Sequence, residues 1–183
     1  MNTFNPTTFN DALISLRKQL LLLTGLGSNY IVNGDSIYGP TAYKMLSDII
    51  GVSPQLSDTF IIFEFKEIED DSYAVTFDNS NNGYTLVPYG LFLKIYGDNA
   101  HTIAAQLQAG LKFSGTVETL FNQGIKYIGL SNIISVNEFI NGIRWPRCDL
   151  ELDILCCVKF NFTDKNSAVI ADKYTHPIEI KSY

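Results

Sequence analysis

The sequence predicts an α+β fold in which helices flank a mainly antiparallel β-sheet. Apolar residues recur with helical spacing at the N-terminus and again after residue 99, whereas they alternate with period two over 59–68, 84–96 and 148–162. Helices and strands are segregated along the chain and joined by short connections, which argues against a parallel doubly wound sheet. The length of 183 residues and the lack of a clear boundary indicate a single domain, 1–183.

The clearest helix is predicted at residues 8–25. Its apolar residues recur at i, i+3, i+4, i+7, i+11 and i+14, and they are Phe9, Ala12, Leu13, Leu16, Leu20 and Leu23. Thr8 suits the N-cap, and Gly25 suits the position after the last turn. Further leucines widen the apolar stripe, so this helix is either buried on two sides or docked on another subunit. An extra, shorter helix is predicted at 40–50.

Period-two alternation predicts the start of a sheet and helix core that covers 59–162. A first strand covers 59–68, a short second strand runs over 73–77, and a longer third strand covers 84–96. Pro88 has no backbone N–H to donate, so it marks an edge, a bulge or a break in the third strand.

The chain then returns to helical spacing. A helix is predicted over 100–111, and a further helical turn ends at Gly124. The predicted inward residues of the helix at 100–111 are Ala100, Ile103, Ala104, Leu107 and Leu111. Residues 125–136 are predicted to form a strand, and 134–142 a loop. The connection after Gly124 therefore leads back into the sheet.

The strongest β signal covers 148–162, where two sets of side chains alternate over about 50 Å of extended chain. A strand of this length is expected to bend or to project beyond the domain. Residues 163–183 are read as a C-terminal extension with two short β-like pieces, at 168–170 and 178–180.

Composition and charge exclude several function classes. Lys and Arg number 13 and Asp and Glu 19, a net charge of −6, and the basic residues are scattered, which argues against tight nucleic-acid binding. The longest aliphatic run is 20–23, and the first residues lack a basic and apolar leader, so neither a membrane-spanning helix nor a signal peptide is expected. Charged residues make up only 17%, which suggests that partners cover some apolar surface.

No catalytic or cofactor motif stands out, so we expect no enzyme activity, no cofactor and no metal. The cysteines Cys148, Cys156 and Cys157 are odd in number and are expected to be buried or idle thiols. His101 and His176 lie far from them in sequence, which leaves no metal-ligand spacing.

One row of ionisable residues lies on the last predicted strand. Asp149, Glu151 and Asp153 share one face, with about 6.5–7 Å between neighbours. The row is open to three interpretations, namely a solvated face, a negatively charged lining or a divalent-cation site. Arg144 and Arg147 could partly neutralise it.

The same arginines flank the only tryptophan. Arg144, Trp145 and Arg147 combine residue types that are enriched at interface hot spots, which suggests a subunit or partner contact. The alternative is that Trp145 packs locally under the sheet edge while the arginines are solvated.

The order of these segments resembles the neck or tail terminator proteins of tailed bacteriophages, over residues 9–162. The segments that carry the resemblance are the strand end LFLKIYGDNA (91–100), the Ala-rich helix AAQLQAGL (104–111), the strand start at 124–125 and IRWPRCDLELDI (143–154). The helix at 40–50 and the tail at 163–183 depart from the compact pattern expected of that family.

The resemblance implies a structural virion protein at the head–tail neck, assembled in the host bacterial cytoplasm. It implies a homo-hexameric ring that contacts the tail tube protein and the head–tail connector or stopper protein. DNA would pass through the ring without specific binding. Asp149, Glu151 and Asp153 would then line the channel, and Arg144, Trp145 and Arg147 would form a contact between subunits or with a partner.

Other functions remain open at this point. The chain could be another neck protein, such as a stopper, a head-completion protein or a tail adaptor. It could instead be a non-viral α+β module that binds a small ligand or a peptide. An enzyme that works through carboxylates alone is a third class.

Overall fold

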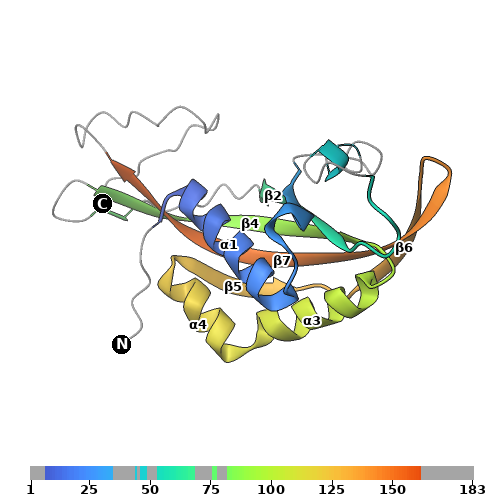
Figure 1. Ribbon diagram of the computed structural model, residues 1–183. Coiled ribbons are helices and arrows are strands. Elements are labelled where there is room, and N and C mark those ends of the chain that lie inside the picture. The colour runs from blue at the N-terminus through green and yellow to red at the C-terminus, as the bar shows by residue number, and fades with distance from the viewer. Residues whose placement is uncertain are drawn as a thin grey trace.

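The protein is represented by a computed structural model. The residues that it describes are 7–34, 44, 46–48, 53–68, 76–77 and 82–161. Within this part, one seven-stranded, mostly antiparallel sheet carries the helices of residues 9–24, 100–112 and 114–122 on one face (Figure 1), so the predicted α+β class is confirmed. The β-like pieces expected at 168–170 and 178–180 lie outside the described residues.

The sheet has the strand order β1-β2-β4-β7-β5, with β3 paired to β4 and β6 paired to β7. The strands are β1 (Ile31–Asn33), β2 (Phe60–Glu67), β3 (Thr76–Phe77), β4 (Asn82–Tyr96), β5 (Ile125–Leu130), β6 (Ile134–Ile140) and β7 (Ile143–Asn161). Only the β1–β2 pair is parallel among the pairs of described strands. Of the short strand predicted at 73–77, only β3 lies within the described residues.

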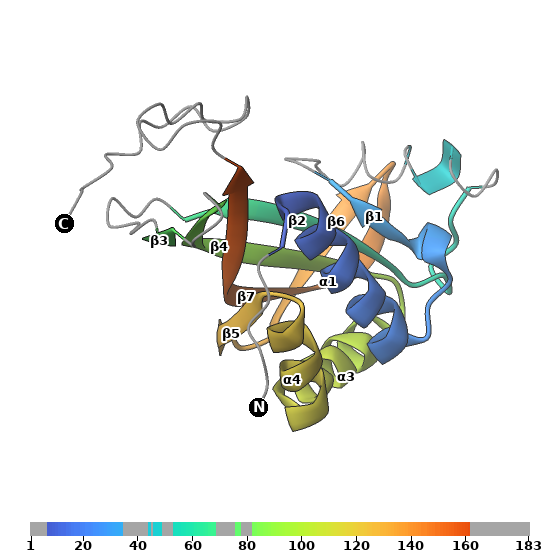
Figure 2. The same cartoon turned by 90° about the vertical axis from the view of Figure 1, so that its left-hand side faces the viewer.

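The long strand β7 organises the sheet. It has 19 residues and begins at Ile143, five residues before the predicted start at Cys148. β4 pairs with it along one edge over all 15 of its own residues. Along the other edge lie β6, then β5, then a single bridge from Thr7 to Val158. β7 bends along its length, as expected for so long a strand (Figure 1, Figure 2).

The prediction for residues 125–142 is wrong in its second half. β5 ends at Leu130, and the segment read as a loop is the strand β6, which forms a hairpin with β7. Asn141 and Gly142 turn the hairpin with φ of 51° and 78°, the left-handed backbone that Asn-Gly turns favour. The alternation was hidden because Phe139 and Ile140 place apolar side chains on both faces of the strand.

Pro88 lies within β4 without disturbing the β4–β7 ladder. Its carbonyl accepts a hydrogen bond of 3.0 Å from the Ile68 amide, on the side of β2. Because the N and O atoms of one strand residue point to the same side, the missing donor also faces that side. β2 ends at Glu67, so Pro88 marks a local edge, one of the three predicted possibilities.

The predicted helices are confirmed with small shifts of their ends. They are α1 (Phe9–Thr24), α3 (Ala100–Lys112) and α4 (Ser114–Asn122). The Thr8 side chain accepts from the Asp11 amide, and Gly25 ends α1 with φ of 67°, so both predicted caps of α1 are correct. Within the helix expected at 40–50, residues 44 and 46–48 are helical, and the rest lies outside the described residues.

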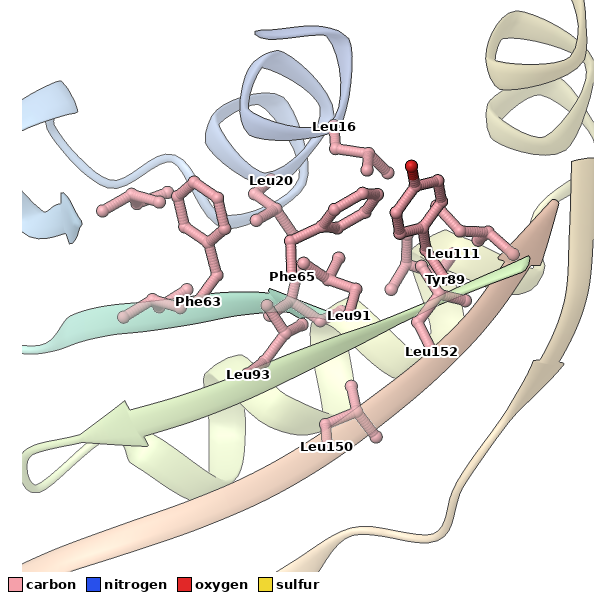
Figure 3. Close-up of a cluster of buried hydrophobic side chains, with 14 of the residues drawn as sticks. Leu16, Leu20, Phe63, Phe65, Tyr89, Leu91, Leu93, Leu111, Leu150 and Leu152 are labelled. Atoms are coloured by element: carbon pink, nitrogen blue, oxygen red, sulfur yellow. The ribbon is translucent and has the colours of Figure 1, made fainter. Parts of the chain in front are cut away.

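The main core lies between these helices and the sheet. Leu16 and Leu20 of α1 point onto the side chains of β2, β4 and β7, including Phe63, Leu91 and Leu152 (Figure 3). Burial of each such side chain contributes roughly 1.5–3 kcal/mol.

A second, smaller cluster lies on the opposite face of the sheet. Its buried members are Val32, Leu46, Phe60, Ile62, Tyr96, Ile140 and Trp145. Alternation along β2 separates the two clusters, since Phe60 and Ile62 face one way and Ile61 and Phe63 the other. The sheet is therefore apolar on both faces near β1 and β6.

Candidate functional site

The face of the sheet that α1, α3 and α4 leave uncovered carries the predicted acidic row. We call it the outer face. Cys148, Leu150 and Leu152 of β7 are buried in the helix-side core, so the residues between and beyond them point outward. Asp149, Glu151 and Asp153 thus share the outer face, as predicted, and all three are half-buried.

Asp149 belongs to a polar network that joins three strands. Arg147 donates from Nη2 to Asp149 Oδ2 at 2.8 Å and from Nη1 to Glu138 Oε2 at 2.7 Å. The Tyr96 hydroxyl donates to the same Glu138 oxygen at 2.8 Å. Arg147 therefore partly neutralises one end of the row, as predicted for this arginine, and it shares its charge between two carboxylates.

Burial and charge together fix the protonation of this network. Burial raises the pKa of Tyr96 above its ordinary value, and the Glu138 carboxylate raises it further. Burial alone would lower the pKa of Arg147, but hydrogen bonds to Asp149 and Glu138 hold it above its ordinary value. Tyr96 stays neutral and Arg147 stays charged at physiological pH.

Glu151 and Asp153 have a more open setting. Neither makes an ion pair with another described residue. Asp153 lies in register between Gly90 of β4 and Gly129 of β5, so no side chain flanks it on either neighbouring strand. These two carboxylates carry the unbalanced negative charge of the row.

Other charged side chains of the outer face lie on the neighbouring strands β2, β4 and β5. Glu64 is buried and pairs with Lys94 at 2.5 Å and with Lys66 at 3.7 Å. Lys126 lies opposite Leu155 in register, so it shares the outer face further along the sheet. Glu64 with its two lysines has a net charge of +1, so the negative charge of the outer face is confined to the middle of β7, with lysines on the strands beside it.

The predicted cluster of Arg144, Trp145 and Arg147 splits into three environments. Trp145 is only 1% exposed and packs edge-on against Phe60, with 5.8 Å between ring centroids and an interplanar angle of 64°. Trp145 thus adopts the local packing that was its alternative interpretation. Arg147 is held in the network, whereas Arg144 is exposed.

Arg144 points away from the acidic row. It pairs in register with Phe139 of β6, which is 69% exposed, on the face of β7 opposite to Trp145. It makes no ion pair with another described residue and cannot neutralise Asp149. Arg144 and Phe139 are thus exposed side by side on this face of the hairpin, although Phe139 carries no sequence signal that would single it out.

Nothing within the described part of the chain groups three or more His, Cys, Asp or Glu side chains for a metal ion. All three cysteines are free and buried, and burial raises the pKa of Cys156 to about 12. His101 is exposed at the start of α3, and His176 lies outside the described residues. Among the described helices, none has the length and apolar character needed to cross a membrane.

One open pocket lies beside Trp145, with a volume of about 350 Å³. Its lining residues are Pro54, Gln55, Leu56, Ser57, Ile143 and Trp145. No charged side chain lines it, and its polar side chains are Gln55 and Ser57, whereas small-molecule sites are usually enclosed and mostly apolar.

Comparison with known proteins agrees with the sequence resemblance. A family model described as "Phage neck terminator protein" matches residues 48–180. The match includes most of the tail at 163–183, which corrects the expectation that this tail departs from the family pattern, whereas α1 lies outside it. No curated protein matches the chain. Because the match covers well over half of the sequence, the chain belongs to the phage neck terminator protein family, whose members are structural proteins of the phage neck.

Proposed function

We propose that the protein is a ring subunit of the head–tail neck. Six copies would close the end of the tail tube, join it to the head connector and leave a channel for DNA. The family match over residues 48–180 carries this proposal. A stopper, head-completion or adaptor role would place the same ring in a neighbouring layer of the neck.

The distribution of exposed apolar side chains supports assembly. A ring made by rotation needs two different contact surfaces on each subunit. Large exposed apolar residues lie on separate elements, with Leu22 of α1 75% exposed, Phe113 between α3 and α4 65% exposed, and Phe139 of β6 69% exposed. Leu22 and Phe113 lie in the helix layer, where the end of α1 contacts α3, whereas Phe139 lies on the β6–β7 hairpin, so the exposed apolar residues are distributed over at least two parts of the fold.

The contact that we assign to the neighbouring subunit centres on Arg144 and Phe139. Trp145 and Arg147 support this surface from within the chain and do not face the neighbour. Replacing Arg144 by Glu should reduce ring formation while the unfolding midpoint stays unchanged, because an exposed residue contributes little to stability. Normal ring formation by this variant would exclude the contact.

We assign the acidic row to the channel. Six copies of a chain with net charge −6 carry −36, and carboxylates along the middle of β7 would repel the phosphates of DNA. Since Arg147 already neutralises Asp149, Glu151 and Asp153 provide the repulsion. The lining therefore acts by preventing adhesion.

Charge reversal tests this lining. Replacing Asp149, Glu151 and Asp153 together by Lys should slow or block DNA ejection, but it also breaks the Arg147 network. The double variant Glu151→Lys/Asp153→Lys keeps that network and is the cleaner test. Replacing the exposed Glu118 of α4 and Asp98 by Lys gives the same change in net charge away from the outer face. Equal ejection from both double variants would refute the lining.

Light scattering with negative-stain imaging tests the ring. Particles near six times 20.5 kDa with a central hole are expected, either alone or after addition of tail tubes. A monodisperse monomer that does not bind tail tubes would contradict the proposal and would favour the ligand- or peptide-binding module.

A further inference from the structure

The β6–β7 hairpin extends beyond the support of the main sheet. β4 ends at Tyr96, which lies opposite Arg147, and residues 143–146 of β7 then pair with β6 alone. The Gly97 amide donates the next bond, to the Pro146 carbonyl at 3.1 Å. A two-stranded hairpin by itself is marginally stable in water. Side-chain contacts must therefore fix its direction.

On the outer face, the Arg147 network provides a polar contact at the base of the hairpin. The Arg147 side chain is 19% exposed and donates hydrogen bonds to Glu138 on β6 and to Asp149 on β7. Its guanidinium carbon also lies 5.9 Å from the centre of the Tyr96 ring, on β4. One side chain thus connects the hairpin to the last residue of β4.

We propose that Arg147 is a positioning residue that sets the direction of the β6–β7 hairpin, and thereby the presentation of Phe139 and Arg144 to a second copy of the chain. The part about the second copy rests on the proposed function. The positioning itself rests on the contacts within one chain.

Arginine suits this position better than lysine. Its planar group carries five donors in a fixed fork, so it reaches two carboxylates on two strands at once and stacks on an aromatic ring. Lysine keeps the charge but cannot hold both carboxylates in one fixed geometry. The proposal therefore predicts that Arg147→Lys retains the fold but loosens the hairpin.

Hydrogen exchange read by mass spectrometry tests the positioning. In Arg147→Lys and Arg147→Met, amides of 134–146 should exchange at least about tenfold faster, the effect of losing one charge-assisted hydrogen bond. Amides of α3 should be unchanged. Arg144→Met is the matched control, because it removes an arginine from the same hairpin without touching the network. Unchanged exchange in the hairpin of Arg147→Lys, or an equal rise throughout the chain, would overturn the proposal.

Ring formation tests the link to the second copy. Arg147→Lys should form rings at a higher protein concentration than wild type, by about the same tenfold factor. A loosened hairpin with unchanged ring formation would overturn this link. If wild type forms no ring with or without tail tubes, the proposed function fails, whereas the exchange measurement still decides the role of Arg147.

Discussion

Replacing Trp145 by alanine is expected to lower the free energy of unfolding by about 3–5 kcal/mol. The indole is 1% exposed and is among the largest fully buried side chains of the described residues. It also makes an edge-to-face contact with Phe60, and such a contact contributes about 0.5–1.5 kcal/mol beyond area burial. Alanine leaves a space between the hairpin and the sheet, next to the open pocket that Trp145 lines.

Urea unfolding followed by circular dichroism measures this loss, since the variant lacks the only tryptophan and cannot be followed by intrinsic fluorescence. The corresponding decrease in Tm is roughly 6–20 °C for a chain of this size. Arg144→Ala, one residue away and exposed, should stay within about 0.5 kcal/mol of wild type.

A loss below about 1 kcal/mol for Trp145→Ala would refute the packing argument. If Trp145→Ala kept its stability but failed to form rings, Trp145 would be a contact between subunits, as first interpreted from the sequence, and not a packing residue. A large loss of stability in the monomer leaves Arg144 and Phe139 as the contact.

Three other measurements test separate parts of the structure. Gly97→Ala should destabilise severely in a thermal melt, because φ is +108° and the added Cβ would lie 2.2 Å from the Asp58 carbonyl oxygen; a normal Tm would contradict the turn. The native protein at pH 8 should resist a thiol reagent, since Cys156 is buried with its pKa near 12, and unfolding should expose three thiols; rapid native reaction would contradict this. Tyr96 has a folded pKa above its unfolded value of 10, so its stabilisation is complete below pH 10 and decreases above it. Between pH 10 and 12, the free energy of unfolding of Tyr96→Phe should therefore fall less than that of wild type. An equal fall in the two proteins would show that Tyr96 does not contribute to this pH dependence.

Local patterns in the sequence were sufficient where one element has one clear apolar face. The predicted inward residues of the helix at 100–111 are the ones that the structure buries in α3: Ala100, Ile103, Ala104, Leu107 and Leu111. The same holds for the caps of α1, because a cap depends on a few adjacent residues.

The pattern was insufficient for β6. Only one of its seven residues, Ile140, is buried, so buried and exposed residues do not alternate along the strand, and Ile134 and Phe139 are 59% and 69% exposed. Its identity as a strand comes from pairing with β7 and from the Asn141–Gly142 turn. A non-local partner is invisible to a periodicity argument.

For the candidate site too, some features follow from the local sequence pattern and others depend on contacts between distant strands. Period two in β7 by itself determined that Asp149, Glu151 and Asp153 share a face, because adjacent strand residues alternate sides. The sequence also determined the α+β class and the resemblance to neck terminators. Only the tertiary structure decided which charges meet, because Glu138 and Tyr96 reach Arg147 from other strands. That folding neutralises Asp149, buries Trp145 and leaves Arg144 exposed on the opposite side of β7.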